Sequence, residues 1–160
     1  MTETAAVSTD HPAEAAVNLL ELERQVCFAL AVASRGVIAV YRPLLEPLRL
    51  THPQYLVMLA MWQYAPLTLT ELGEHLQLDP ATLSPLLKRL ETTGYLTRLR
   101  DPENERALRL MLTDTGTQLR EQALAIPEAV MARLGLDLTE VRELHGFLGG
   151  LIERSHRSVR

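Results

Sequence analysis

Residues 69–100 read LTELGEHLQLDPATLSPLLKRLETTGYLTRLR, and this stretch decides the fold. Thr68 and Glu71 form a capping-box pattern, which predicts the start of a short helix. Asp79 followed by Pro80 predicts a second helix start, with Asp79 as the N-cap and Pro80 as the first helical residue. The stretch therefore predicts two short helices joined by a tight turn.

The second of these helices is amphipathic. Its leucines recur with the spacing i, i+3, i+4 and i+7: Leu83, Leu86, Leu87 and Leu90. Gly94 is placed to end the helix. Pro85 disturbs the pattern, because proline lacks a backbone donor and clashes with the preceding turn. We expect either a kink at Pro85 or a helix that becomes regular only from Ser84.

A β-hairpin follows the two helices. The segments YLTRLR (95–100) and RALRLML (106–112) alternate their side chains with a period of two, and DPENE (101–105) between them favours a turn. These are the only convincing strands in the sequence. Helix, tight turn, amphipathic helix and basic hairpin is the order of a winged helix-turn-helix, in which the second helix enters the major groove of DNA.

Helical periodicity also marks the regions on both sides of this stretch. Residues 19–45 and 114–155 carry apolar side chains every three or four positions, and Pro127 interrupts the second region. Thr51 and Gln54 form another capping box, ahead of a mostly apolar helix that we expect to be buried. The fold class is therefore mainly α, with one small β-hairpin.

Composition indicates a soluble, cytoplasmic chain of 160 residues, 47% of them apolar. A single cysteine excludes an intrachain disulfide, and residues 1–16 lack the pattern of a signal or transit peptide. The longest uncharged run, residues 50–70, contains prolines and polar side chains, so no membrane span is expected. Five acids and one base in residues 1–26 account for −4, the whole net charge.

Basic charge is concentrated around the predicted hairpin. No lysine or arginine occurs between Arg49 and Lys88, and then six occur within residues 88–109. Arg100 and Arg106 bracket the hairpin turn, where a guanidinium can enter the minor groove. The outward residues of the second helix are expected to face base edges and phosphates: Thr82, Ser84, Lys88 and Arg89. The alternative is an ordinary solvated surface, since six bases against four acids leave only +2.

Several segments together resemble the MarR winged-helix regulators, and among these the one-cysteine organic hydroperoxide regulators called OhrR. The segments are QVCFAL (25–30), YRPLLEPLRLTHPQYLVML (41–59), LTELGEHLQLDPATLSPLLKRLETTGYLTR (69–98) and NERALRLMLTDTG (104–116). The resemblance covers residues from about 22 to 155, nearly everything beyond the N-terminal segment.

The resemblance implies an intertwined homodimer that binds a pseudo-palindromic operator in double-stranded DNA and represses a peroxide-detoxifying gene, without a cofactor or a metal. Residue patterns give a disordered tail (1–18) and a winged helix-turn-helix lobe (67–113), and the resemblance makes the flanking helices (19–66 and 114–156) a dimerisation region. One departure affects the wing, because Asn104 stands where the family usually has an aspartate. Asn104 can still accept a hydrogen bond from Arg106, but without charge assistance.

The lone thiol, Cys27, lies about a turn and a half into the first predicted helix. Buried cysteines often act as small apolar residues, so simple core packing is one interpretation. The resemblance implies another, because Cys27 falls on the peroxide-sensing cysteine of the family. Such a cysteine reacts as its thiolate, attacks the peroxide and becomes a sulfenic acid, and nearby hydrogen-bond donors favour the thiolate.

Two donors are available for such a thiolate: Tyr41 and His52. Tyr41 is 14 residues after Cys27, a rotation of about 1400°, so the two share a helix face but lie nearly four turns apart. The resemblance implies that the symmetry mate brings Tyr41 to Cys27. His52 and Ala31 stand where the family often has tyrosines. We expect a neutral His52 that donates one hydrogen bond, with an exposed histidine at a helix start as the alternative.

Three alternatives to a peroxide-sensing repressor remain open at this point. A MarR-type repressor could instead be released by a small aromatic or phenolic ligand, with Cys27 only structural. An enzyme with Cys27 as nucleophile is disfavoured, because no histidine and acid motif accompanies it. A structural interaction module would bind no DNA. In the favoured reading the reactants are an organic hydroperoxide and a low-molecular-weight thiol, since no second cysteine is present to resolve a sulfenic acid.

Overall fold

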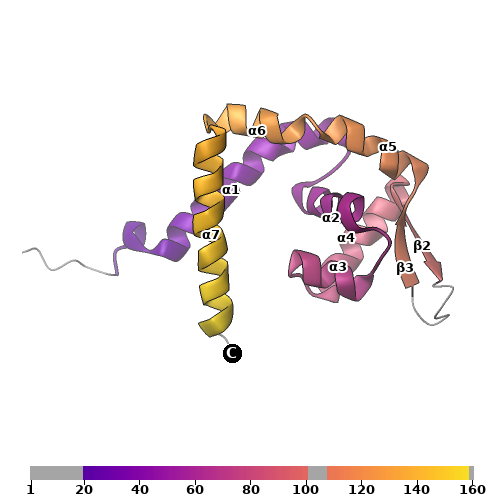
Figure 1. The fold of residues 1–160 in the computed structure, drawn as a ribbon, viewed down its shortest axis with the longest axis horizontal. Coiled ribbons are helices and arrows are strands. Elements are labelled where there is room, and N and C mark those ends of the chain that lie inside the picture. Colours follow the sequence, from indigo (N-terminus) through magenta and orange to yellow (C-terminus); the bar gives the residue numbers. More distant parts are fainter. Residues whose placement is uncertain (1–19, 101–107, 159–160) are drawn as a thin grey trace, which may run out of the picture. The chain divides into compact units, whose positions relative to one another are not determined.

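The computed structural model describes residues 20–100 and 108–158 (Figure 1). The expected tail over residues 1–18, the hairpin turn DPENE, Asn104 and Arg106 lie outside these ranges. The chain divides into two compact units, residues 1–35 and residues 36–160, which are described separately.

The described part of the first unit consists of a 3-10 turn, η1 (Leu22–Arg24), and the start of helix α1 (Val26–Leu45). The expected helix start at residue 19 was wrong: α1 begins at Val26, because Glu21 and Gln25 on either side of η1 adopt extended backbone angles. Cys27 is thus the second residue of α1 and is exposed, so it is not packed into the core of the described chain.

The second unit begins with the rest of α1, a second 3-10 turn η2 (Glu46–Leu48) and helix α2 (His52–Tyr64). The Thr51 capping box is confirmed, since the Thr51 backbone N–H donates to Gln54 Oε1 at 2.8 Å. Helix α2 has apolar side chains all around, and most of one side is buried, as the sequence predicted. Tyr55, Val57, Met58 and Met61 of this helix contribute to the core.

The lobe that follows is the predicted winged helix-turn-helix. Helices α3 (Leu69–Leu76) and α4 (Pro80–Thr93) are followed by strands β2 (Leu96–Arg100) and β3 (Leu108–Leu112). Thr68 N–H donates to Glu71 at 2.7 Å, Thr82 N–H donates to Asp79 at 2.9 Å, and Gly94 ends α4 with a φ of 83°. Both predicted caps and the predicted C-terminal glycine are therefore confirmed.

Pro85 lies inside α4, which runs without interruption from Pro80. The alternative that regular helix begins only at Ser84 was therefore wrong. Asp79 explains the earlier start, because it satisfies the backbone N–H of Thr82 and so stabilises the first turn ahead of the proline.

A third strand, β1 (Leu67–Thr68), was missed by the sequence reasoning. The sheet order is β1-β3-β2 and both pairings are antiparallel, with Leu67 opposite Leu110 and Leu96 opposite Leu112. Two residues cannot display an alternating pattern, so β1 exists only because β3 offers it backbone partners.

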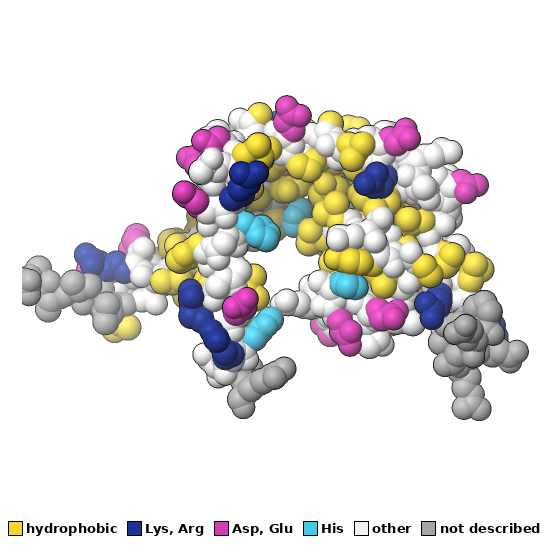
Figure 2. All heavy atoms as spheres, viewed as in Figure 1, with side chains coloured by type: hydrophobic (Ala, Val, Ile, Leu, Met, Phe, Trp, Pro, Cys, Tyr) yellow, Lys and Arg dark blue, Asp and Glu magenta, His cyan; other side chains and the backbone are white. Residues whose placement is uncertain are grey.

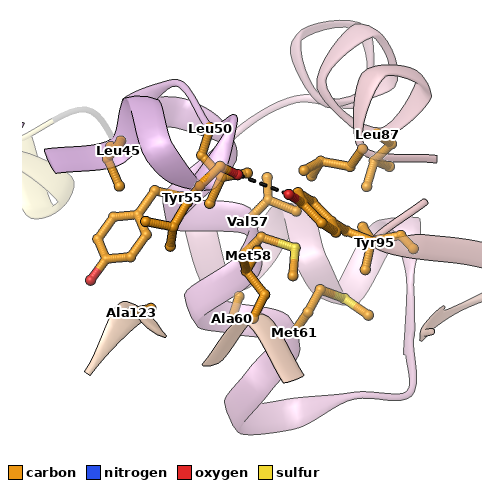
Figure 3. Close-up of a cluster of buried hydrophobic side chains, with 14 of the residues drawn as sticks. Leu45, Leu50, Tyr55, Val57, Met58, Ala60, Met61, Leu87, Tyr95 and Ala123 are labelled. Carbon is orange, nitrogen blue, oxygen red and sulfur yellow. Dashed lines mark hydrogen bonds between the residues drawn. The ribbon is translucent and has the colours of Figure 1, made fainter. Parts of the chain in front are cut away.

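The core of the second unit joins α2, α4 and the start of β2. Figure 3 shows side chains of α2 gathered with Leu87 of α4 and with Tyr95. The buried Tyr95 hydroxyl donates to the carbonyl of Leu48 at 2.9 Å, so the base of the wing is fixed to the turn that follows α1. Burial of this cluster holds α4 with its opposite side facing outward.

Three helices complete the described part of the chain: α5 (Asp114–Ala123), α6 (Ile126–Leu134) and α7 (Leu138–Ser158). The expected interruption is confirmed, because Pro127 lies in the first turn of α6. Trp62 of α2 donates its indole N–H to the carbonyl of Gly116 in α5 at 2.8 Å. Helix α7 has no buried residue within the chain, and Leu138 and Phe147 are 60% and 63% exposed.

One described helical segment, Val26–Leu48, is long and apolar enough by length and composition to cross a membrane, with a mean hydropathy of 1.4. The sequence reasoning considered only residues 50–70 and overlooked it. An apolar helix of a soluble protein can have the same length and composition. Among the described residues, Leu45 is the one buried residue of α1, so most of the apolar surface of this helix is left uncovered.

Candidate DNA-binding surface and sensor residues

Helix α4 divides into a buried side and an outward side. Leu83, Leu87 and Leu90 are buried, and the predicted contact residues are all exposed: Thr82, Ser84, Lys88 and Arg89. The leucine spacing therefore orients the helix as the sequence predicted. Neither Lys88 nor Arg89 makes an ion pair with a described residue, so both charges are available to phosphates.

The first turn of α4 is organised by the N-cap. Thr82 Oγ1 donates to Asp79 Oδ2 at 2.8 Å, and Ser84 Oγ donates to the carbonyl of Pro80 at 2.7 Å. The backbone hydrogen bond from Thr82 lowers the pKa of Asp79, so this carboxylate stays ionised. Thr82 and Ser84 thus have their hydroxyl protons engaged, and their oxygens remain able to accept hydrogen bonds from base amino groups.

A hollow of about 490 Å³ lies along α4, lined by Gln54, Pro85, Lys88, Arg89, Thr92 and Thr93. Gln54 and the two threonines were not among the predicted contact residues. Thr92 Oγ1 donates to the carbonyl of Lys88 at 2.8 Å, which leaves its oxygen to accept. The place of Gln54 beside α4 could not be predicted from sequence, because it results from the packing of α2 against α4.

The described part of the wing carries Arg98 and Arg100. Arg100 is exposed at the end of β2, opposite Leu108. Arg98 Nε lies 2.8 Å from Glu91 Oε1 of α4, and the two side chains are 33% and 29% exposed. The Nε–H group of the Arg98 side chain nevertheless has no hydrogen-bond partner. The contact with Glu91 is therefore an ion pair whose N–H does not point well at the carboxylate oxygen. This pair, which the sequence reasoning missed, links the wing to α4.

The two predicted sensor donors of the second unit lie together. The rings of Tyr41 in α1 and His52 in α2 have centroids 5.0 Å apart in an edge-to-face arrangement. A third ring, Tyr55, lies 5.9 Å from Tyr41. Tyr55 was missed, although its spacing of three residues from His52 on one helix was a signal that it shares that face.

Burial determines the protonation of this cluster. It lowers the pKa of His52 and raises the pKa of Tyr41, so at neutral pH the histidine is neutral and the phenol is protonated. Burial, followed by the neighbouring Tyr41, raises the pKa of Tyr55. The neutral His52 agrees with the sequence expectation, but burial rather than the helix dipole is its cause. Each of these rings can donate one hydrogen bond to an anion.

No group of three or more His, Cys, Asp or Glu side chains able to hold a metal ion occurs among residues 20–100 and 108–158.

The fold and the orientation of α4 define a winged helix-turn-helix protein. The sequence profile of the MarR family matches residues 50–108. An organic hydroperoxide resistance transcriptional regulator from Bacillus subtilis (strain 168) is 39% identical over 138 residues, which is 86% of this chain and 94% of that protein. The chain belongs to the MarR family, and it is a DNA-binding transcriptional regulator rather than an enzyme.

Solved structures of AbfR, a Staphylococcus epidermidis protein, share this fold. Reduced AbfR bound to DNA is 35% identical with a TM-score of 0.76, and the match covers 87% of this chain and 95% of that one. Overoxidized AbfR bound to DNA is 34% identical with a TM-score of 0.67, covering 83% and 93%. The resemblance expected from the sequence segments is therefore confirmed at the level of family and fold.

Proposed function

We propose that this protein is a repressor which senses organic hydroperoxides through oxidation of Cys27 and then releases its operator. The observation that carries the proposal is the pairing of Tyr41 and His52, which brings a protonated phenol and a neutral imidazole together. Two donors of this kind favour a thiolate over a thiol, and only the thiolate attacks a peroxide efficiently. The similarity to a regulator of organic hydroperoxide resistance supports the same oxidant.

The donors serve the thiol of the opposite subunit. Cys27 and Tyr41 lie nearly four turns apart on one helix, which excludes direct contact within a straight α1. A homodimer removes this difficulty, because Tyr41 and His52 of one subunit can meet Cys27 of the partner subunit.

The surfaces of α1 and α7 support a homodimer. Both helices leave large apolar side chains exposed within one chain: Val26, Leu30, Val32 and Ile38 of α1, with Leu138, Leu144, Phe147 and Ile152 of α7. Apolar side chains are visible at the surface among charged ones in Figure 2. Residues of about 20–45 and 114–155 would bury this surface in a dimer. Sedimentation tests the assembly, and a stable monomer at micromolar concentration contradicts it.

DNA recognition is assigned to α4 and the wing. Thr82, Ser84, Lys88 and Arg89 face the major groove. Arg100 and Arg106 of the wing enter the minor groove, and Asn104 accepts a hydrogen bond from Arg106. The two-fold symmetry of a dimer requires a pseudo-palindromic operator with half-sites about 34–36 Å apart. A DNA-binding repressor of this kind works in the cytoplasm. A footprint over one half-site only contradicts this arrangement.

The sensing step is a two-electron oxidation. The Cys27 thiolate attacks the terminal oxygen of the hydroperoxide, the O–O bond breaks, and the alkoxide leaves with the bonding electrons and takes up a proton to give an alcohol. The sulfenic acid then condenses with a low-molecular-weight thiol, forming a mixed disulfide and water. The added group alters the dimer region and so disfavours the DNA-bound arrangement.

Intact mass and operator binding, measured together before and after one equivalent of cumene hydroperoxide, test this function. We expect a mass increase of one oxygen, or of the added thiol when one is present, in step with loss of binding. Undiminished binding by fully oxidised protein contradicts the proposed release.

A second candidate function is favoured by a cavity of about 310 Å³ between α2, α5 and α6. Tyr55, Trp62 and Arg120 are among its lining residues, and together they suit an aromatic or phenolic ligand with an acidic group. In this case the ligand releases the operator and Cys27 is only structural. Titrating Cys27→Ser with such compounds distinguishes the two functions, because a ligand-released repressor responds without the thiol.

A further inference from the structure

Four aromatic rings form a continuous chain that begins at the proposed sensor donors. The ring centroids of His52 and Tyr41 are 5.0 Å apart, those of Tyr41 and Tyr55 are 5.9 Å apart, and those of Tyr55 and Trp62 are 6.4 Å apart. Three of the rings belong to α2 and Tyr41 belongs to α1, all within the second unit. Centroid separations of about 4.5–7 Å are those of aromatic pairs in contact, so each ring packs on the next.

Trp62 ends this chain and joins α2 to α5. Its indole N–H donates to the carbonyl of Gly116 at 2.8 Å. Gly116 has no room for a side chain, because a Cβ there would overlap the carbonyl oxygen of Tyr95. The first turn of α5 therefore lies directly on the backbone of Tyr95. A close-packed contact of this kind transmits a displacement instead of absorbing it.

Tyr95 stands at the junction of the two elements assigned to DNA. Its backbone N–H donates to the carbonyl of Leu90 near the end of α4 at 3.0 Å, and β2 begins at the next residue along the chain. The hydroxyl of Thr113, the N-cap of α5, donates to the carbonyl of Gly94 at 2.6 Å. The start of α5 is thus tied to the residues that set the angle between α4 and the wing.

The aromatic chain supplies a route from the sensor donors to this junction. Tyr55 lies across the core from Tyr95 (Figure 3). Trp62 contacts both the Tyr55 ring and the Gly116 carbonyl, so it bridges the two. Packed side chains have discrete arrangements, so a change at one ring shifts its neighbour. Energetic coupling between separated sites is carried by such chains of packed side chains and hydrogen bonds.

We propose that Trp62 is a positioning residue that couples oxidation of Cys27 to release of the operator. The group added at the thiol displaces the Tyr41 and His52 rings, the Tyr55 ring follows, and Trp62 shifts the start of α5 against the base of the wing. Helix α4 and the wing then leave the geometry that fits the operator. The inference rests on the proposed peroxide-sensing function, and the oxidation itself is the two-electron step given above.

Trp62 is the only tryptophan in the chain, so intrinsic tryptophan fluorescence reports this residue alone. Reduced full-length protein without DNA is treated with one equivalent of cumene hydroperoxide, and the emission is followed together with the intact mass. We expect the Trp62 emission to change in step with the mass increase at Cys27. Cys27→Ser, treated identically, should show no change, which controls for direct damage to the indole. Constant emission in fully oxidised protein overturns the inference.

Variants test the route through a coupling ratio, the Kd of the oxidised protein divided by the Kd of the reduced protein. The DNA is one duplex that the reduced native protein selects from a random-sequence pool. Trp62→Phe keeps a ring but lacks the N–H, and Tyr55→Leu removes the middle ring. Each should reduce the ratio about fivefold, the factor for one hydrogen bond or one aromatic pair. A native ratio in either variant overturns the inference.

Two further variants show whether the effect is specific. The ratio compares two end states of one variant, so a slower oxidation or a uniform loss of affinity cancels. Tyr55→Phe should retain the native ratio, because it keeps the ring that packs on Trp62. Tyr64→Leu should also retain it, since the Tyr64 ring of α2 stacks on His75 at 4.1 Å, outside the chain of rings. If either variant lowers the ratio as much as Tyr55→Leu does, the inference fails.

Alkylation separates this inference from the proposed function. Iodoacetamide adds a group to Cys27 without any peroxide, and the DNA affinity of the modified protein is compared with that of the unmodified protein. If hydroperoxide fails to oxidise Cys27 but alkylation weakens binding, with a smaller effect in Trp62→Phe, the inference stands and only the sensing function fails. If both treatments weaken binding equally in the native protein and in Trp62→Phe, the function stands and the inference fails. If neither treatment changes binding by the native protein, both fail.

Discussion

The ion pair between Glu91 of α4 and Arg98 of β2 should set how the wing meets DNA. Its side chains are about one-third exposed and its N–H is poorly aligned, so it lies between a surface pair and a buried one. We therefore estimate its contribution at about 1 kcal/mol. Glu91→Gln should lower the melting temperature by about 3 °C, a shift typical of that free energy in a chain of this size.

Loss of this ion pair in Glu91→Gln should also weaken operator binding about fivefold per lobe, since 1 kcal/mol corresponds to that factor. Removing a negative charge near DNA would by itself tighten binding. A decrease in operator affinity therefore indicates that Glu91 acts by positioning the wing. Glu74→Gln on α3 is the matched control, because Glu74 is exposed and makes no ion pair with a described residue. It should bind DNA equally or slightly better.

Fluorescence anisotropy with labelled operator is the assay, applied as a double-mutant cycle with Arg100→Ala. If Glu91 acts by orienting the wing, Glu91→Gln should cost little further affinity once the wing arginine is gone. Exchanging the charges, with Glu91→Arg and Arg98→Glu together, should recover part of the loss. An equal loss with and without Arg100 would refute the reasoning, because the pair would then act on folding or on α4 alone.

Other perturbations address the sensor and the phosphate contacts. Cys27→Ser should bind operator like the native protein yet ignore organic hydroperoxide in a gel-shift assay, because serine cannot form a sulfenic acid. Tyr41→Phe and His52→Phe should each slow alkylation of the Cys27 thiol about fivefold, because each removes one hydrogen-bond donor worth about 1 kcal/mol. If a variant leaves the alkylation rate unchanged between pH 5 and 9, the substituted residue is not part of the sensor. Burial lowers the pKa of His52, so the unfolded chain binds a proton near pH 6.5 that the folded protein does not. The native free energy of unfolding in urea should therefore fall as pH drops below about 6.5, and His52→Phe should flatten this part of the profile. Lys88→Ala should reduce the slope of log K against log salt by about one unit, and an unchanged slope would exclude Lys88 from the phosphate contacts.

The sequence by itself determined the lobe to a large extent, because the signals involved are local. The box of Thr68 with Glu71, the N-cap Asp79 and the C-terminal Gly94 act within one turn of the chain, and each was confirmed. The leucine spacing of α4 likewise settled which side faces outward. The family followed from the same segments. The roles of the individual DNA and sensor residues stay predictions.

Only the tertiary structure decided which residues of separate helices and strands meet. It supplied β1, the Glu91–Arg98 pair, Tyr55 beside Tyr41, and the contact of Trp62 with Gly116. It also decided that His52 is neutral through burial. Periodicity and capping arise from interactions of a residue with its neighbours within about one helical turn. The contacts named here depend instead on how separate helices and strands pack, and no local sequence pattern encodes that packing.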